Sequence, residues 1–439
     1  MKASTEVAGS APPPLREARR AARAAFIGTT IEWYDFYIYA STATLVFGRE
    51  FFPSLSGTAA TLASFATISV AFVARPLGGV IFAHFGDRIG RKATLIASLL
   101  LMGTSTTLVG LLPGYQSIGM WAPVLLVVLR FLQGVAVGGE WGGAVLIATE
   151  FAPPDRRARL SSWPQQGVTA GLALSTALLL LVSVVIPEDA YVAWGWRLAF
   201  LFSTVLIVLG LVLRLRIKES PVFEARRERV RQQSGEEGLP IARLFRESRR
   251  TTVLAMVTYL AVSTTFYVPF TFLLSHATTV LEISQPVALT SVLVAAGVYS
   301  IGMRLGAGLA DRRGRRTAML TGLIGSIVAV FPMVALVETG SPVLFAVGLA
   351  LFVLPVGCVY APVGVYFAEL FPTATRYSGV TVANQGGSLF GAAIAPFVAV
   401  ALYNAFGMYA VGGYLAVTAV LSAVAVCLLG ETRHLAIDR

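Results

Sequence analysis

The chain is dominated by apolar blocks, most of them about twenty or more residues long. An α-helix rises 1.5 Å per residue, so ~20 apolar residues are enough to cross ~30 Å of hydrocarbon. Such blocks lie at residues 26–48, 60–85, 93–112, 121–149, 161–186, 196–213, 251–280, 287–310, 317–338, 342–367, 379–402 and 407–430. The pattern predicts an all-α integral membrane protein with twelve transmembrane helices.

Composition supports the same class of protein. Of 439 residues, 56% are hydrophobic and only 13% are charged, with a mean hydropathy of +0.74. A soluble chain of this length needs more charge to cover its surface. The Arg-bearing segment before residue 25 leads into a full-length span without a small-residue cleavage pattern, so we expect the first span to be retained.

Positive charge is sorted between the connections, which predicts the orientation of the chain. Lys and Arg residues gather in both tails and in four of the connections between spans, and a fifth connection carries Arg376. The connections that alternate with these carry only one basic residue, Arg49. Basic residues near spans are retained on the cytoplasmic side, so both termini are predicted to be cytoplasmic in a multi-pass inner membrane protein. The net charge of +11 suits anionic lipid and does not require nucleic acid.

A long basic segment divides the chain into two halves of six spans. The predicted organisation is a cytoplasmic tail, a six-helix bundle, a cytoplasmic linker, a second six-helix bundle and a cytoplasmic tail, at 1–25, 26–213, 214–250, 251–430 and 431–439. The halves share landmarks: "GDRIGRK" at 86–92 and "ADRRGRR" at 310–316 place Asp87 and Asp311 224 residues apart, and the Glu150 and Glu369 that precede Arg157 and Arg376 are 219 apart. An internal duplication of a six-helix unit explains both intervals.

These features together resemble the major facilitator superfamily of secondary transporters. Within it, "EWYDFYIYA", "ARPLGGVIFAHFGDRIGRK", "RFLQGVAVGGEWGGA", "WGWRLAFL" and "ESPVFE" resemble the metabolite:proton symporter family, which includes permeases for α-ketoglutarate, citrate, shikimate and proline or betaine. The resemblance extends over almost the whole chain after residue 20. It implies two pseudo-symmetric six-helix bundles around a central cavity, lined mainly by the first, fourth, seventh and tenth helices, and a functional monomer.

The paired loops predict a latch between the two halves on the cytoplasmic side. Asp87 and Asp311 each sit where a span meets a Gly-containing turn, a place where a carboxylate can accept backbone N–H groups of a neighbouring helix and pair with an Arg. The candidate partners are Arg91, Arg157, Arg315 and Arg376. The alternative is a run of positive charge that only sets topology, with Asp as a solvated turn residue.

Five ionisable residues lie deep within the spans of the first half. They are Glu32, Asp35, Arg75, Arg130 and Glu140. A charge facing lipid at the bilayer centre costs on the order of 2.5–3.5 kcal/mol on insertion scales, so these side chains should face a cavity or one another. A nearby Arg favours the ionised form of a carboxylate, and burial favours the protonated form. Asp35 is therefore the leading candidate proton carrier, with Arg130, Glu140 and Glu32 as coupled groups, unless the set is a static salt-bridge network.

Arg75 is the leading candidate for a contact with substrate. It precedes Pro76 and two glycines, a local sequence that can loosen a helix, and its planar guanidinium pairs well with an organic carboxylate. A structural role in neutralising Asp35 or Glu140 is the alternative. Further candidates are the polar side chains that a small metabolite could bond, namely Gln133, Gln165, Tyr267 and Asn384, although tyrosines in membrane helices also serve as packing residues.

The sequence therefore predicts a transporter and not an enzyme. It contains no Gly-rich phosphate loop with Lys and Ser or Thr, its two Cys and three His are scattered, and neither cofactor nor metal is expected. The predicted function is proton-coupled uptake of a small organic metabolite, foremost a carboxylate, by alternating access. The alternatives are uptake of a zwitterionic solute, proton antiport of organic cations or drugs, and a sensor built on the same scaffold.

Overall fold

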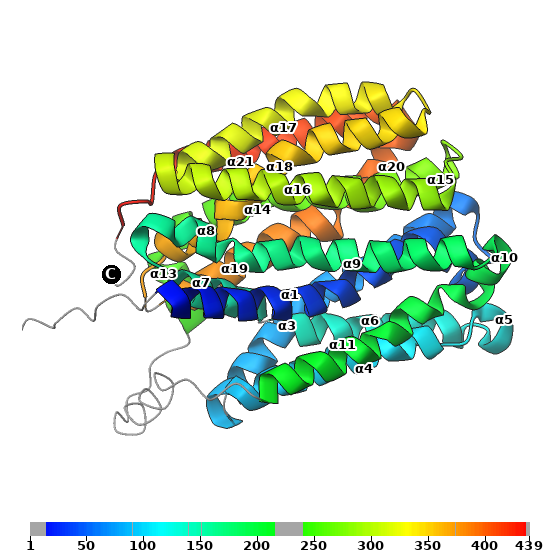
Figure 1. The fold of residues 1–439 in the computed structure, drawn as a ribbon, viewed down its shortest axis with the longest axis horizontal. Helices are drawn as coiled ribbons and strands as arrows, with labels where there is room; N and C mark the ends of the chain where they lie inside the picture. The colour runs from blue at the N-terminus through cyan, green and yellow to red at the C-terminus, as the bar shows by residue number, and fades with distance from the viewer. Residues whose placement is uncertain are drawn as a thin grey trace, which may run out of the picture.

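The computed structural model describes residues 15–89, 91–138, 140–150, 152–215, 240–373 and 375–435. The regular secondary structure of this part is helical throughout. Figure 1 shows long helices aligned roughly along one axis, with the N-terminal half of the chain below the C-terminal half. Both described ends of the chain lie at the same end of the molecule, on the left of Figure 1, which we name the terminal face. The opposite end, with α5, α10 and α15, is named the distal face.

The described residues of the N-terminal half form six membrane-crossing segments, several of them broken into shorter helices. Their bounds are α1 (Leu15–Thr42) with η1 (Ala43–Phe47) and α2 (Gly48–Phe51), α3 (Gly57–Ile89), α4 (Arg91–Leu111), α6 (Trp121–Val137) with α7 (Glu140–Glu150), α9 (Trp163–Val185), and α11 (Arg197–Leu215). Short connecting helices are α5 (Tyr115–Ile118), η2 (Pro154–Arg156), α8 (Arg157–Ser161), α10 (Glu188–Ala190) and η3 (Tyr191–Gly195).

The C-terminal half repeats this arrangement. Its elements are α13 (Pro240–Glu247), α14 (Arg249–Tyr267) with η4 (Val268–Leu273) and α15 (Leu274–Thr279), α16 (Gln285–Arg313), α17 (Arg315–Val337), α18 (Pro342–Leu370), α19 (Arg376–Ser388) with η5 (Leu389–Ala393) and α20 (Ala395–Phe406), and α21 (Met408–Leu429). The π-helical segments η1 and η4 follow the first helix of each half. Such segments mark places where the regular hydrogen-bond ladder is interrupted.

Helix length and hydropathy agree with a multi-pass membrane protein. Within the described residues, nine helices are long and apolar enough to cross a membrane, and the pair Glu188–Gly195 and Arg197–Val212, bent by 48°, makes ten. The other two predicted spans correspond to α1, which carries Glu32 and Asp35, and to α4, whose apolar part is the shorter Ile96–Leu111. Many large exposed side chains are apolar, such as Val185, Phe406 and Val343, as expected of a surface that contacts lipid.

Two element boundaries differ from the sequence-based expectation. The first helix begins at Leu15, eleven residues before the predicted span at 26, because the basic segment LREARRAARAA is rich in strong helix formers. The predicted linker at 214–250 contains the helix α13, and its Leu244 is fully buried. Residues 216–239 lie outside the described part.

The internal duplication is visible in how the helices pack. A Cβ added at Gly138 would overlap the backbone oxygen of Arg75, and one added at Gly357 would overlap that of Tyr299. Gly138 and Gly357 are 219 residues apart, and Arg75 and Tyr299 are 224 apart, the two intervals found between the sequence landmarks. The same close helix contact, α3 against α6 and α16 against α18, is therefore built twice from small residues.

Candidate functional site

A small cavity lies between the two halves, at mid-length of the helices. Its volume is about 30 Å³, room for a few water molecules. Side chains from α1, α3, α6, α7 and α9 of the N-terminal half line it, together with others from α14, α16, α18 and α19 of the C-terminal half. The ionisable or amide groups on its wall are Glu32, Arg75, Asn384 and Gln385, and aromatic side chains form most of the remainder: Trp33, Tyr37, Trp141, Tyr259, Phe266, Tyr267, Tyr299 and Tyr360.

Arg75 is held in this cavity by aromatic rings. Its Cζ lies 4.4 Å from the ring centre of Phe72, 5.1 Å from that of Phe36 and 5.5 Å from that of Trp33. The side chain is buried, its Nε has no hydrogen-bond partner, and no described carboxylate forms a salt bridge with it. Aromatic faces attract a guanidinium without using its N–H groups, so these donors stay available for another acceptor.

A second, smaller cavity of about 10 Å³ lies within the N-terminal half, and Asp35 faces it. Ser203 of α11 donates a hydrogen bond of 2.6 Å to Oδ1 of Asp35, and Oδ2 has no hydrogen-bond partner among the described residues. Glu32, Arg75 and Val137 line both cavities. The two spaces are thus separate but share a wall that contains one basic and one acidic side chain.

Arg130 lies on the second cavity but does not form an ion pair with Asp35 in the described structure. Its Nη1 donates to Gln133 at 2.9 Å, and Gln133 donates in turn to the Thr106 hydroxyl at 2.6 Å. The guanidinium is stacked between Tyr39 and Phe36, with Cζ 4.0 Å and 4.5 Å from the two ring centres. Arg130 is therefore fixed in place by Gln133 and by two aromatic rings.

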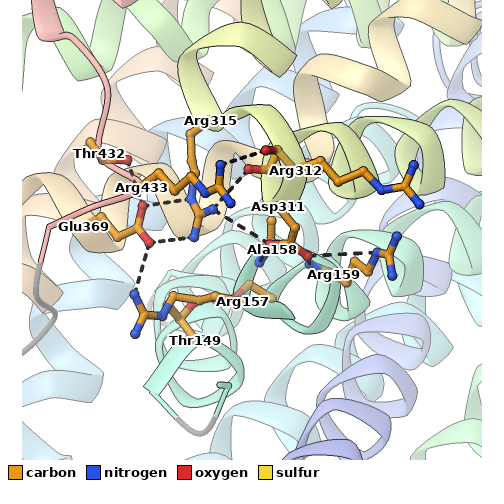
Figure 2. A network of polar contacts seen from close by, with 12 residues as sticks. Thr149, Arg157, Ala158, Arg159, Asp311, Arg312, Arg315, Glu369, Thr432 and Arg433 are labelled. Carbon is orange, nitrogen blue, oxygen red and sulfur yellow. Dashed lines mark hydrogen bonds and ion pairs between the residues drawn. The ribbon is translucent and has the colours of Figure 1, made fainter. Parts of the chain in front are cut away.

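A network of charged and polar contacts joins the two halves at the terminal face (Figure 2). Asp311, near the end of α16, accepts the backbone N–H groups of Ala158 and Arg159 at 2.8 and 3.1 Å. These groups lie at the start of α8 in the other half, where a helix N-terminus favours an anion. The predicted carboxylate contact is present for the second of the paired loops.

Glu369, near the end of α18, is the centre of this network. It accepts two hydrogen bonds from Arg315, at 3.0 and 2.8 Å, and forms an ion pair of 3.4 Å with Arg157 across the two halves. Arg315 also lies 3.8 Å from Asp311. Arg315 and Glu369 are completely buried, and the bidentate geometry is that of a strong charge-assisted pair.

The segment after α21 also belongs to this network. The sequence did not indicate a role for this segment. Glu431 accepts the backbone N–H groups of Arg315 and Arg316 at the start of α17, at 2.9 and 3.1 Å. The Thr432 hydroxyl donates to Glu369 at 2.7 Å, and Arg433 donates to the Arg312 carbonyl. The predicted tail at 431–439 is therefore, over its described part, a strap across the terminal face.

The remaining predicted site residues have different locations. Tyr267 and Asn384 line the central cavity, and Gln133 faces the second one. Gln165 lines neither cavity and packs beside Gly364 of α18, since it lies on the side of α9 that faces that helix. Arg376 donates to the Ala368 and Phe371 carbonyls and so ties the end of α18 to α19. The side chains of Asp87, Arg91 and Glu140 lie outside the described part.

Sequence reasoning missed several residues that complete these sites. Ser203 and Thr106 are ordinary small polar residues in apolar helices, and no local signal marks them. Trp33 and Trp141 have a signal in hindsight, because each directly follows a membrane-embedded glutamate in "EWYDF" and "GGEWGG". Glu369 was visible in the repeated spacing of seven residues from Glu to Arg, yet its partners Arg157 and Arg315 belong to other segments.

Comparisons with known proteins agree with this architecture. The Major Facilitator Superfamily model matches residues 25–389 and 298–437. The chain is 42% identical over 428 residues to the inner membrane metabolite transport protein YhjE of Escherichia coli K12. It is 39% identical over 426 residues to the shikimate transporter of the same organism. Each of these alignments covers 96% of this chain and 96% of the relative. It is 31% identical over 372 residues to the proline/betaine transporter of the same organism, covering 83% of this chain and 74% of the relative.

The fold is that of a solved transporter. The proton:xylose symporter XylE, in a structure bound to 6-bromo-6-deoxy-D-glucose, superimposes with a TM-score of 0.76 over 96% of this chain and 98% of its own, at 16% identity. With two pseudo-symmetric six-helix bundles, a cavity between them and relatives that are transporters over nearly their full length, the chain belongs to the major facilitator superfamily and is a multi-pass membrane transporter.

Proposed function

We propose that the protein is a proton-coupled symporter that takes up a small organic carboxylate by alternating access. The observation that carries this proposal is the position of Arg75, which lines both the central cavity and the cavity of Asp35. A single guanidinium thus borders the space where a metabolite can bind and the space of the candidate proton carrier. The relatives named as metabolite and shikimate transporters support the substrate class.

The walls of the central cavity suit a carboxylate. The Arg75 guanidinium and the indole N–H groups of Trp33 and Trp141 can only donate hydrogen bonds, and Nε of each of these side chains is buried without a partner. Buried donors that lack partners are costly, so a ligand with several acceptor oxygens would relieve them. A carboxylate offers two such oxygens and the charge that Arg75 needs.

Coupling follows from the shared wall. When a substrate carboxylate binds Arg75, the positive charge is compensated from the central cavity and stabilises an ionised Asp35 less. Proton uptake at Asp35 and substrate binding then favour each other, as symport requires. The fixed position of Arg130 on Gln133 makes Arg75 the better candidate for the group that responds to substrate.

The contacts at the terminal face provide a gate. Asp311 and Glu369 bind groups of the opposite half, so these contacts must break when the terminal face opens. In alternating access, a rocking motion of one bundle against the other would exchange this closed face for a closed distal face. Ser69 already donates a hydrogen bond of 2.6 Å to the Ala393 carbonyl on the distal side of Arg75.

We further propose that the terminal face is cytoplasmic and that the protein works as a monomer in the inner membrane. The basic connections support the orientation, and the name of YhjE supports the membrane. A reporter that becomes active only in the cytoplasm should be active when fused after Arg439, and one fused at the distal connection Leu112–Tyr115 should be inactive. The reverse pattern would contradict the orientation.

A zwitterionic solute is a second candidate because of the aromatic wall. Trp and Tyr faces bind quaternary ammonium groups, the cavity contains Glu32 beside Arg75, and relatives are named as proline/betaine transporters. Uptake of shikimate, proline and glycine betaine into proteoliposomes under an imposed proton gradient separates the two classes. Loss of a preloaded cation in exchange for entering protons would instead indicate antiport.

Replacing Arg75 by Lys should reduce carboxylate uptake at least about tenfold with expression unchanged. Lys keeps the charge but loses the planar fork and its bidentate hydrogen bonds. The measurement is initial uptake of the accumulated probe by proteoliposomes that contain equal amounts of each variant. Arg304→Lys, the same change at an exposed position of α16, is the control, and unchanged kinetics in Arg75→Lys would remove Arg75 from the substrate site.

A further inference from the structure

The carboxylate of Asp35 is hydrogen-bonded by a helix of its own half, an arrangement that the sequence did not predict. Its contact is with α11, the last helix of the N-terminal half, and not with the opposite half of the molecule. Ser203 donates to Oδ1 of Asp35 at 2.6 Å, and the two side chains are 0% and 1% exposed. Asp35 therefore points into the interior of its own bundle, toward a helix that does not line the central cavity.

No described Lys or Arg side chain forms an ion pair with Asp35, so Ser203 is its hydrogen-bond partner without competition from a basic group. The other charged groups on its cavity are Arg75 from α3, Arg130 from α6 and Glu32 from α1 itself, and Tyr34 of α1 is a titratable neighbour of Asp35. Neither Arg75 nor Arg130 lies within salt-bridge distance of Asp35, and the Tyr34 hydroxyl donates a hydrogen bond to the Ala199 carbonyl. The packed faces of α4 and α11 contribute hydroxyl groups, Thr106 and Ser203, and α9 contains no titratable residue.

The C-terminal half contains a serine equivalent to Ser203, but this serine does not bond to a carboxylate. Ser422 of α21 lies 219 residues after Ser203, which is one of the two repeat intervals. It donates to the Val257 carbonyl at 2.7 Å and accepts the backbone N–H of Ala261 at 3.1 Å, both on α14, the first membrane-crossing helix of that half. In both halves a serine of the last helix therefore bonds to the first helix, but only in the N-terminal half does its partner titrate.

We propose that Ser203 is a positioning residue for proton binding at Asp35, an inference that rests on the proposed role of Asp35 as the proton carrier. The hydroxyl donates to the ionised carboxylate and thereby favours proton release, and it fixes Oδ1 so that Oδ2 is the oxygen that takes the proton. A hydrogen bond to the charged form of an acid always favours that form. Ser203 thus sets the pH range in which Asp35 can load and unload.

The test is an infrared pH titration of the purified full-length protein in liposomes, which needs no substrate. The carboxylic-acid C=O band that disappears in Asp35→Asn is assigned to Asp35. Ser203→Ala should move the midpoint of this band to higher pH by about one to two pH units, the size expected for loss of a hydrogen bond to a charged group. Ser203→Cys, a weaker donor, should move it by less in the same direction.

Ser422→Ala is the matched control, because it removes the same kind of bond at the equivalent place and should leave the midpoint unchanged. The proposal is overturned by an unchanged midpoint in both Ser203 variants, by an equal shift in Ser422→Ala, or by the absence of any band that depends on Asp35. Should Asp35→Asn lose gradient-driven uptake while the Ser203 variants titrate normally, the proton carrier would stand and only the role of Ser203 would fall.

Discussion

Asp35→Asn should abolish substrate accumulation driven by a proton gradient while leaving substrate exchange in place. Asn is nearly isosteric with protonated Asp but cannot ionise, so it should hold the transporter in its proton-loaded form. Ser203 can still donate to the Asn carbonyl oxygen, which preserves the contact between α1 and α11. The loss of accumulation should be complete, whereas exchange of labelled for unlabelled substrate should remain within a few-fold of the parent protein.

Two assays in the same proteoliposomes decide this prediction. One measures accumulation of the transported probe under an imposed pH gradient, and the other measures exchange at equal pH on both sides. Asp155→Asn, the same chemical change at a carboxylate that is 71% exposed, controls for expression and reconstitution. If Asp35 were only part of a static polar network, exchange and accumulation would fall together with stability, and a variant that still concentrates substrate would exclude Asp35 as the obligatory carrier.

Glu369→Gln should give the largest loss of stability among single substitutions at the terminal face. The neutral amide removes the ion pairs of Glu369 with two buried guanidinium groups. Arg157 then loses its salt bridge, and Arg315 keeps only the longer ion pair of 3.8 Å with Asp311. Breaking a buried ion pair from one side costs about 3–5 kcal/mol, which should lower Tm by at least several degrees. The terminal face should also open more often, because the contact between the two halves is weakened.

Thermal unfolding and the labelling rate of a cysteine introduced near Thr375 report the two effects separately. Arg157→Gln removes the contact across the halves but keeps the bidentate pair of Arg315 and Glu369, so it should raise labelling with a smaller loss of Tm. Glu338→Gln at the exposed end of α17 serves as the control. Labelling at the parent rate in both latch variants would show that these contacts do not gate access.

The contacts of Asp311 at the terminal face were open to prediction because their signal is local. Asp, Gly and Arg recur at the same offsets in 86–92 and 310–316, and a carboxylate at the end of a span has few partners other than a helix N-terminus. Asp311 and Arg315 accordingly lie where the loop motif places them. The strap from Glu431 to Arg433 could not be predicted, since its partners lie 63 to 121 residues earlier in the chain and depend on where α21 ends.

For the interior residues, the sequence predicted the depth along each helix but not which neighbouring helix each side chain faces. Counting residues along a span places Asp35 and Arg75 near mid-depth, since the rise of a helix is constant. Which neighbour a side chain faces depends on the rotation of each helix, and that is set by packing of residues such as Gly138 against the backbone of α3. Asp35 therefore contacts Ser203 and has no direct pair with Arg130, and Gln165 faces α18 and not the cavity.

The volume of the central cavity has a consequence for inhibitors. At about 30 Å³, the central cavity is far smaller than the pockets of roughly 300 Å³ or more in which proteins usually bind small molecules. A ligand must therefore push the helices apart, and its measured affinity will be the contact energy minus the cost of this expansion. For the proposed carboxylate substrates, compounds small enough to be enclosed again should be carried through and larger carboxylates should prevent closure. The length of the molecule beyond its carboxylate should then separate substrates from competitive blockers.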